Sequence, residues 1–349
     1  MRVFVGHTDD PSPQHAVDEV IEQIEGRLQG RAPRGALLYS CIDFDHQTLL
    51  DGIQRRWPGL PLVGCTTDGE CSSTNAFMED SVVLTVFEGD ELDLRVGLGR
   101  GLREDPDRAG AEAAAQIRSN APPALVIAVP DSIGVSGARV VDALNRHLPA
   151  ESVVVGGTAG DQWQFRETRQ FFGDQVLTGV LPLLAIGGRV RVSVGVASGW
   201  RPIGRVGQVT RADAAVVHEI DGKPAIEFLR TNAGVQAHAT PEYPFAIRTG
   251  PDDGFVLRAP MDTSPTDGSI TFAGDVPQGA QVQITEAGRA QILEGARSAA
   301  RQAFEGYDSA KPDAMLIFSC AARKQVLGTR CSEEIGLLLD GQPALDAAG

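Results

Sequence analysis

Residues 64–70 read GCTTDGE and follow directly on the apolar run Leu60–Val63. These seven residues include two glycines, two hydroxyls, one thiol and two carboxylates, so they suit a catalytic site, a ligand-binding loop or a tight turn. A second stretch, GGTAGD at residues 156–161, follows the apolar run Val153–Val155. Glycine lets a backbone turn sharply and approach a neighbouring group closely. The two stretches therefore predict paired loops at the ends of two buried strands.

The elements before each loop follow the same order, which predicts an internal duplication. A strand over 36–41 and a helix with apolar residues at 49, 50, 53 and 57 precede the first loop. A strand over 124–130 and a helix with apolar residues at 140, 141, 144 and 148 precede the second. We therefore expect duplicated β-α-β units at about 36–100 and 124–188. Their loops lie at strand carboxyl ends, where α/β proteins build binding sites.

A third, partial copy is predicted near the C-terminus. A helix over 292–304 leads to a strand over 314–320, and Ser332–Glu334 suit the N-cap and first turn of another helix. Ser40-Cys41 and Ser319-Cys320 are both expected to end their strands. After Leu339 we find neither the closing strand nor the glycine loop that the first two copies contain, so we expect either a degenerate third unit or a chain that lacks its final ~40 residues.

The stretch between the second and third copies is rich in predicted strands. Residues 189–197 alternate cleanly, 205–210 and 214–220 suit a hairpin, and Asp221-Gly222 make a turn into a short helix that begins at Pro224. Further strands are expected at 254–257, 269–272 and 280–284. The expected fold class is α/β, with a duplicated domain at 1–190 and a β-rich α/β domain at 191–349.

Length and charge exclude several classes of protein. A chain of 349 residues suits about two domains. The net charge is −15 without a basic cluster, so binding to nucleic acid or an anionic membrane is not expected. No apolar stretch approaches the ~20 residues that span a bilayer, and the N-terminus does not resemble a signal peptide. Five cysteines without a CxxC pair suit reduced thiols, and we expect a cytoplasmic protein.

Familiar catalytic and metal-binding patterns do not occur in the sequence. We find no GxSxG, HExxH, paired CxxC or Walker motif, and the six histidines lie in no recognisable triad context. Cys65 is a candidate nucleophile for a hydrolase or transferase, but a thiol after a buried strand more often packs as a small apolar group. His218 alternates toward one face of a strand, where it suits either a haem iron or a polar rim. We expect no enzyme activity and no metal.

The paired loops suit a small-molecule binding site better than a catalytic or metal site. Their threonines and glycine amides donate hydrogen bonds, and Asp68, Glu70 and Asp161 accept them from an ammonium group. Arg323 follows the third predicted strand and offers a fork suited to a carboxylate, so an amino acid would satisfy both sets. The alternative is that each loop is only a tight strand exit and Arg323 only a surface charge. The ligand-binding candidates are Gly64, Cys65, Thr66, Thr67, Gly69, Glu70, Gly157, Thr158, Asp161 and Arg323.

Six motifs, taken in order, resemble the FIST family of sensory proteins. They are Val63–Glu70, Val155–Asp161, Ser198–Gly204 with Val209-Thr210, Glu219–Ala225, Phe272–Asp275 and Phe318–Arg323. The resemblance covers residues 20 to 339, with the N-terminal and C-terminal FIST regions meeting near residue 190. It adds Trp200, in the third motif, to the ligand-binding candidates. It implies a cytoplasmic ligand-sensing module, and without an output domain such a module signals through a separate partner such as a histidine kinase or a cyclic-dinucleotide enzyme.

The resemblance also implies two alternative ligands, and this chain departs from the family pattern in one place. Amino acids have been proposed as ligands for the family, and some members bind haem and sense nitric oxide. His218 and His238 are the candidate haem ligands here; otherwise we expect no cofactor. The family normally closes with a glycine-aromatic loop ending Gly-Glu-Ile, which does not follow Leu339. We expect its absence to leave a pocket wall open or a sheet edge unpaired.

Overall fold

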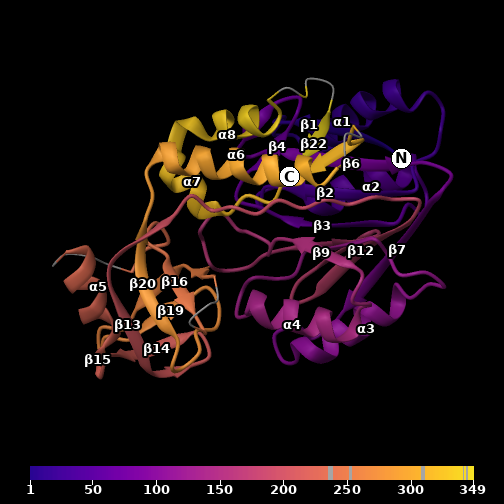
Figure 1. Cartoon of the computed structure of the whole chain (residues 1–349). Coiled ribbons are helices and arrows are strands. Elements are labelled where there is room, and N and C mark those ends of the chain that lie inside the picture. Colours follow the sequence, from indigo (N-terminus) through magenta and orange to yellow (C-terminus); the bar gives the residue numbers. More distant parts are fainter. Residues whose placement is uncertain (235–238, 251–253, 308–310, 341, 343–344) are drawn as a thin grey trace.

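The computed structural model describes residues 1–234, 239–250, 254–307, 311–340, 342 and 345–349. Three α/β units lie together, and a β-rich part stands beside them (Figure 1). The fold class is α/β, as the sequence predicts. No described helix combines the length and the apolar composition needed to cross a membrane.

The first unit contributes four strands to a six-stranded sheet, with two helices on the outer face of those strands. Its elements are β1 (Arg2–Thr8), α1 (Pro13–Leu28), β2 (Gly35–Ser40), α2 (His46–Arg56), β3 (Leu62–Thr66), β4 (Glu70–Ser72), β5 (Ala76–Met78) and β6 (Val82–Glu88). The strand order is β1-β6-β2-β3, in which β2 and β3 are parallel and β6 runs antiparallel to both of its neighbours. Helix α1 begins where the Ser12 hydroxyl accepts from the His15 amide and proline occupies the first turn.

The second unit repeats this order. Its elements are β7 (Leu92–Gly99), α3 (Pro106–Gln116), β8 (Leu125–Ala128), α4 (Gly137–His147), β9 (Val153–Gly156), β10 (Gln170–Phe172), β11 (Gln175–Leu177) and β12 (Leu181–Gly188). The strand order β7-β12-β8-β9 matches that of the first unit. The structure thus confirms the duplication, which includes β1 and α1 and therefore begins earlier than the sequence suggested.

The two glycine loops occupy equivalent places. A Cβ on Gly64 would lie 1.9 Å from the carbonyl oxygen of Leu38 on β2, and a Cβ on Gly156 would lie 1.9 Å from that of Ala128 on β8. Real Cβ atoms do not approach a carbonyl oxygen so closely. Each parallel strand pair therefore needs glycine where its second strand passes this carbonyl group, within β3 in the first unit and at the last residue of β9 in the second.

A third unit follows at the C-terminus and corrects one expectation. Its elements are α6 (Arg289–Glu305), β21 (Ala314–Leu316), α7 (Ala321–Leu327), the 3₁₀ turn η1 (Gly328–Arg330), α8 (Cys331–Leu338) and β22 (Asp346–Ala348). The prediction that the closing strand is absent was wrong, because β22 pairs in parallel with β21. The small residues of β22 carry little strand signal. A Cβ on Gly349 would lie 2.0 Å from the Ile317 carbonyl oxygen, which makes Gly349 the third equivalent of Gly64 and Gly156.

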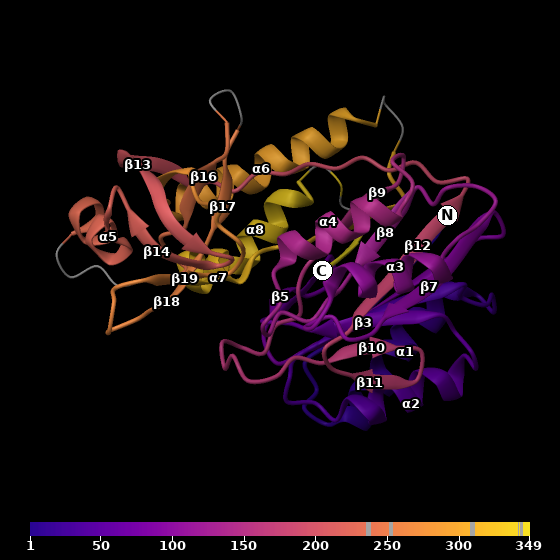
Figure 2. The same cartoon turned by 90° about the horizontal axis from the view of Figure 1, so that it is seen from below.

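The β-rich part has its own sheet and core. Its elements are β13 (Arg201–Asp213), β14 (Val216–Ile220), β15 (Lys223–Pro224), α5 (Ala225–Ala233), β16 (Phe245–Arg248), β17 (Val256–Arg258), β18 (Pro260–Thr263), β19 (Ile270–Phe272) and β20 (Gln281–Glu286). The predicted hairpin is present as β13 and β14. The strand expected at 189–197 does not form: residues 189–200 run along α6, where a Cβ on Gly195 would meet the Ala299 carbonyl oxygen (Figure 2).

One central core joins the three units. It contains Val3, Leu37 and Val63 from the first unit, Ile127 and Leu184 from the second, and half-buried Val192, Ala314 and Leu316 from the third. The helices cover the outer faces: α1 and α2 the first sheet, α3 and α4 the second, and α6 and α8 the third. This arrangement brings the carboxyl ends of the paired parallel strands together.

Candidate functional site

The loops that leave the three parallel strand pairs meet in one place, which we call the exit-loop cluster (residues 66–70, 156–163 and 318–324). The Gly160 amide donates to the Thr66 carbonyl (2.8 Å), which joins the first two loops. The Lys324 ammonium, from the third unit, donates to the Asp68 carbonyl (2.8 Å). Loops predicted to be paired by sequence are therefore in direct contact.

Several predicted ligand-binding residues in this cluster face the protein interior. Cys65 and Thr66 are buried, and burial raises the pKa of the Cys65 thiol. The Thr66 hydroxyl accepts from the Arg169 amide (3.1 Å). Gly64 packs on Leu38, and a Cβ on Gly69 would meet the Phe77 ring at 2.4 Å. These four residues shape the loop, and their role as ligand contacts stays a prediction.

Asp161 organises the second loop. Its carboxylate accepts from the amides of Phe165 (3.0 Å), Arg166 (2.7 Å) and Glu167 (3.2 Å). Gln162, Trp163 and Phe165 have positive φ, a conformation that costs energy for residues other than glycine. The buried carboxylate offsets this cost by binding three neighbouring amides, so Asp161 is a loop-forming residue.

Arg323 and Trp200 have internal partners, and their expected role as ligand contacts stays a prediction. The Arg323 guanidinium is buried and pairs with Glu334, and it also donates to the carbonyls of Ser198 (2.6 Å) and Ile292 (2.9 Å). The buried indole of Trp200 donates to the Glu242 carbonyl (3.1 Å). Sequence alone shows an arginine after a strand, but the packing of α8 beneath it decides that it is buried.

Gly157, Thr158 and one carboxylate oxygen of Asp68 are the remaining polar groups of the cluster. Gly157 and Thr158 are exposed. The Oδ1 oxygen of Asp68 is buried and has no hydrogen-bond partner in the described structure. Burial raises the pKa of Asp68, while the nearby amides of Gln162 and Trp163 and the Lys324 charge lower it.

Glu70 and Thr67 belong to a buried polar network. The carboxylate of Glu70 accepts from the hydroxyls of Thr67 and Ser81, the latter at 2.6 Å. The His7 ring lies 3.1 Å from the Ser81 hydroxyl and 2.8 Å from that of Ser72. Burial raises the pKa of Glu70 to about 7 and lowers the pKa of His7 to about 4. Glu70 is thus a buried carboxyl group and not an exposed acceptor.

Replacing Glu70 with glutamine is expected to change how stability depends on pH. The folded-state pKa of Glu70 lies above its ordinary value of 4.5, so its stabilising contribution is complete below pH 4.5 and is lost as pH rises through 7. Relative to the wild type, the variant should gain stability over this range, by ~1 kcal/mol per pH unit. The lowered pKa of His7 acts in the opposite direction but is common to both proteins. Urea unfolding at pH 4.5 to 7.5 measures the difference, and a constant difference would contradict the prediction.

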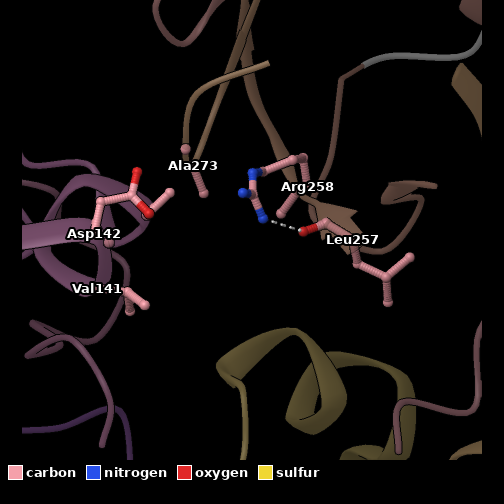
Figure 3. Close-up of a pocket in the computed structure, with 9 residues that line it drawn as sticks. Val141, Asp142, Leu257, Arg258 and Ala273 are labelled. Atoms are coloured by element: carbon pink, nitrogen blue, oxygen red, sulfur yellow. Dashed lines mark hydrogen bonds between the residues drawn. The ribbon is translucent and has the colours of Figure 1, made fainter. Parts of the chain in front are cut away.

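A cleft lies between the second unit and the β-rich part. It has a volume of about 440 Å³ and is lined by Gly137, Ala138, Val141 and Asp142 of α4 and by Leu257, Arg258, Ala259, Ala273 and Gly274 opposite. Figure 3 shows the Asp142 carboxylate and the Arg258 guanidinium on opposite sides of the gap. Gly137 adjoins Thr158, so the cleft borders the exit-loop cluster. Beside it, Arg139 of α4 pairs with Asp275 at 2.7 Å.

Arg258 supplies the positive charge in the lining of this cleft. Its guanidinium donates to the carbonyls of Asp275 (3.1 Å) and Leu257 (3.0 Å), and no carboxylate oxygen of the described residues lies within 4 Å of it. Burial lowers its pKa, and the charge of Asp275 opposes that shift. The sequence did not indicate these residues because Arg258 lies on a short strand, Asp142 lies on the polar side of a helix, and the two are far apart in the chain.

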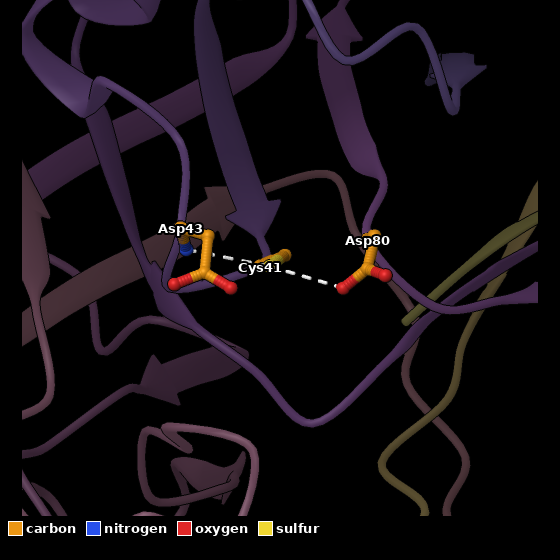
Figure 4. Close-up of side chains that lie close together, drawn as sticks. All are labelled: Cys41, Asp43 and Asp80. Carbon is orange, nitrogen blue, oxygen red and sulfur yellow. Dashed lines mark hydrogen bonds between the residues drawn. The ribbon is translucent and has the colours of Figure 1, made fainter.

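The other candidates are a possible metal site and two possible haem ligands, and the structure gives less support to each of them than to the cleft. Cys41, Asp43 and Asp80 form the group of potential metal ligands found among the described residues (Figure 4). Burial raises the pKa of the Cys41 thiol to about 12, and the thiol donates to Asp80 (3.5 Å), so the group is explained by hydrogen bonding. His218 lies 3.4 Å from Asp267, and His238 lies outside the described residues. The haem alternative therefore stays a prediction, as does the absence of enzyme activity.

Comparisons with known proteins identify two family models and several relatives that match the chain. A family model described as the FIST N domain matches residues 35–223, and one described as the FIST C domain matches residues 225–349. An uncharacterised protein of Mycobacterium tuberculosis H37Rv is 27% identical over 349 residues, which cover 93% of this chain and 86% of the relative. An uncharacterised protein of Methanocaldococcus jannaschii is 27% identical over 221 residues, 60% of this chain and 42% of the relative.

Proposed function

Because this chain belongs to the FIST family, whose domains serve in sensing and signal transduction, we propose that it binds a small zwitterion such as an amino acid and signals through a separate partner. The observation that carries the proposal is the cleft between α4 and β17, where Asp142 and Arg258 stand on opposite walls. Its volume falls in the range of small-molecule sites, which are common where two parts of a protein meet.

The chemistry of the two walls suits a zwitterion. A guanidinium binds a carboxylate with two parallel hydrogen bonds, and the partly desolvated Arg258 has no carboxylate partner of its own in the described structure. The Asp142 carboxylate supplies an acceptor for an ammonium group on the other wall. Arg258 thus takes the role that the sequence assigned to Arg323, and Asp142 that of the loop carboxylates.

The position of the cleft supports the signalling part of the proposal. A ligand held by both walls would favour the arrangement in which α4 and the β-rich part lie close together, and so shift the population of conformations. A histidine kinase or a cyclic-dinucleotide enzyme that recognises this arrangement would serve as the partner. All five cysteines are free, which suits the cytoplasm, where such partners act.

Substitution of Arg258 tests the proposal in a thermal-shift screen of amino acids, small carboxylates and haem. An amino acid at a hundredfold excess over its Kd should stabilise the protein by about 2.7 kcal/mol. Arg258→Ala should abolish that stabilisation, because the carboxylate loses its partner, and Asp142→Asn should weaken it for amino acids but not for simple carboxylates. Arg211→Ala, on the exposed side of β13, is the matched control and should respond like the wild type.

Two results would contradict this assignment. Stabilisation by an amino acid that persists in Arg258→Ala would place the ligand elsewhere. A Soret band acquired with haem and lost on substitution of His218 or His238 would favour the haem alternative.

A further inference from the structure

The lining of the cleft between α4 and β17 limits which ligand side chains it can hold. Two charged side chains, those of Arg258 and Asp142, belong to the described lining. The other described lining residues are glycine, alanine, valine and leucine, whose side chains neither donate nor accept hydrogen bonds. Once the two charges bind the carboxylate and ammonium groups of a zwitterion, the described side chains offer the rest of the ligand an aliphatic surface.

The guanidinium of Arg258 is fixed on one wall of the cleft. Its Nε donates to the Asp275 carbonyl (3.1 Å), and its Nη1 donates to the Leu257 carbonyl (3.0 Å). A Cβ on Gly274 would lie 3.2 Å from Nε, so glycine lets the arginine side chain lie against the backbone. Nη2 has no partner among the described residues, which leaves it and one hydrogen of Nη1 for a carboxylate.

One face of α4 forms the opposite wall. Ala138, Val141 and Asp142 follow the i, i+3, i+4 spacing that places residues on one side of a helix. The helix packs on its own sheet through Val140 and Leu144 instead. Figure 3 shows Val141 beside Asp142, across the gap from Arg258. Val141 is 48% exposed, so an apolar residue that the helical pattern assigns to the core faces the cleft.

The wall that contains Arg258 offers few free backbone groups. The Ala273 amide donates to the Ala259 carbonyl (2.8 Å), and both residues line the cleft. The Leu257 carbonyl accepts from Arg258. These amide and carbonyl groups already have partners within the protein, so this wall presents mainly methyl groups to a ligand.

The difference between a polar and an apolar ligand side chain follows from this lining. A hydroxyl or amide that leaves water for such a surface loses hydrogen bonds that the wall does not replace. An aliphatic side chain instead gains free energy by removing its own surface and that of Val141 from water. The cleft therefore favours aliphatic over polar side chains of the same size.

Building on the function proposed above, we propose that the ligand is an amino acid with an aliphatic side chain. Arg258 and Asp142 hold its carboxylate and ammonium groups, and its side chain packs on Val141 of α4. Val141 is then the residue that determines specificity, because it is the largest apolar side chain on the α4 wall.

Titration calorimetry of the full chain tests this with amino acids of matched size. Leucine should bind at least tenfold more tightly than asparagine, and valine more tightly than threonine. Val141→Asp places a carboxylate on the aliphatic wall, so it should weaken leucine binding at least tenfold and strengthen lysine binding. The matched control is Val206→Asp, which changes a 47% exposed valine on β13 and should keep the preference for leucine.

The outcomes separate this specificity from the function on which it rests. Equal binding of leucine and asparagine, or a leucine preference that survives Val141→Asp, would overturn the aliphatic specificity. If Arg258→Ala still abolished binding in that case, the zwitterion site itself would stand. Absence of binding by every amino acid would overturn both.

Discussion

Gly64→Ala is expected to destabilise the protein by about 3 kcal/mol or more. The added Cβ would lie 1.9 Å from the Leu38 carbonyl oxygen, inside a parallel strand pair that is buried on both faces. Neither backbone can withdraw without breaking the β2–β3 ladder or the pairing of β3 with β10. Urea unfolding followed by circular dichroism measures the loss.

Gly26→Ala is the matched control for this substitution. Gly26 lies on the exposed side of α1, and an added Cβ there would meet no atom within 4 Å. Since alanine favours a helix over glycine, this variant should gain up to about 1 kcal/mol. Equal stability of Gly64→Ala and the wild type would show that the exit glycine is not required by the close approach to Leu38.

Arg323→Met is expected to cost ~3–5 kcal/mol, because it leaves the Glu334 carboxylate buried without its partner. The guanidinium also satisfies the carbonyls of Ser198 and Ile292, so the substitution removes three sets of bonds. These partners come from the segment before β13, from α6 and from α8. The loss should therefore loosen the third unit as a whole, and urea unfolding of the variant measures it.

A double variant distinguishes a buried ion pair from a general packing defect. Arg323→Met combined with Glu334→Leu removes both charges, and replacing a whole buried pair costs less than breaking it. We expect the double variant to be more stable than Arg323→Met alone. If it is less stable by the sum of the two single effects, the two residues are not coupled in the way the structure implies.

Substantial parts of the fold could be predicted from the sequence because they depend on local signals. Apolar runs flanked by glycine loops identify β2, β3 and β8, which are buried on both faces and so need continuous apolar residues, and also β9, which is half-buried. The order of strand, helix and loop predicts the duplication. The hairpins β4–β5 and β10–β11 escaped prediction because three-residue strands carry little pattern and pair with other units.

The candidate site was less predictable. GCTTDGE contains the residue types of a binding loop, but burial turns Cys65, Thr66 and Glu70 inward. Arg258 and Asp142 lie on elements that only the docking of the β-rich part against α4 brings together. A local pattern reports which groups are available, whereas burial and long-range contact decide which of them meet a ligand.

By itself, the sequence of this protein determined where the chain turns and which apolar runs form strands of the duplicated units, because these are properties of neighbouring residues. The tertiary structure alone decided that each hairpin completes the sheet of another unit, that Arg323 is an internal ion pair and that Arg258 faces the cleft. These outcomes depend on contacts between residues far apart in the chain, for which local spacing holds no information.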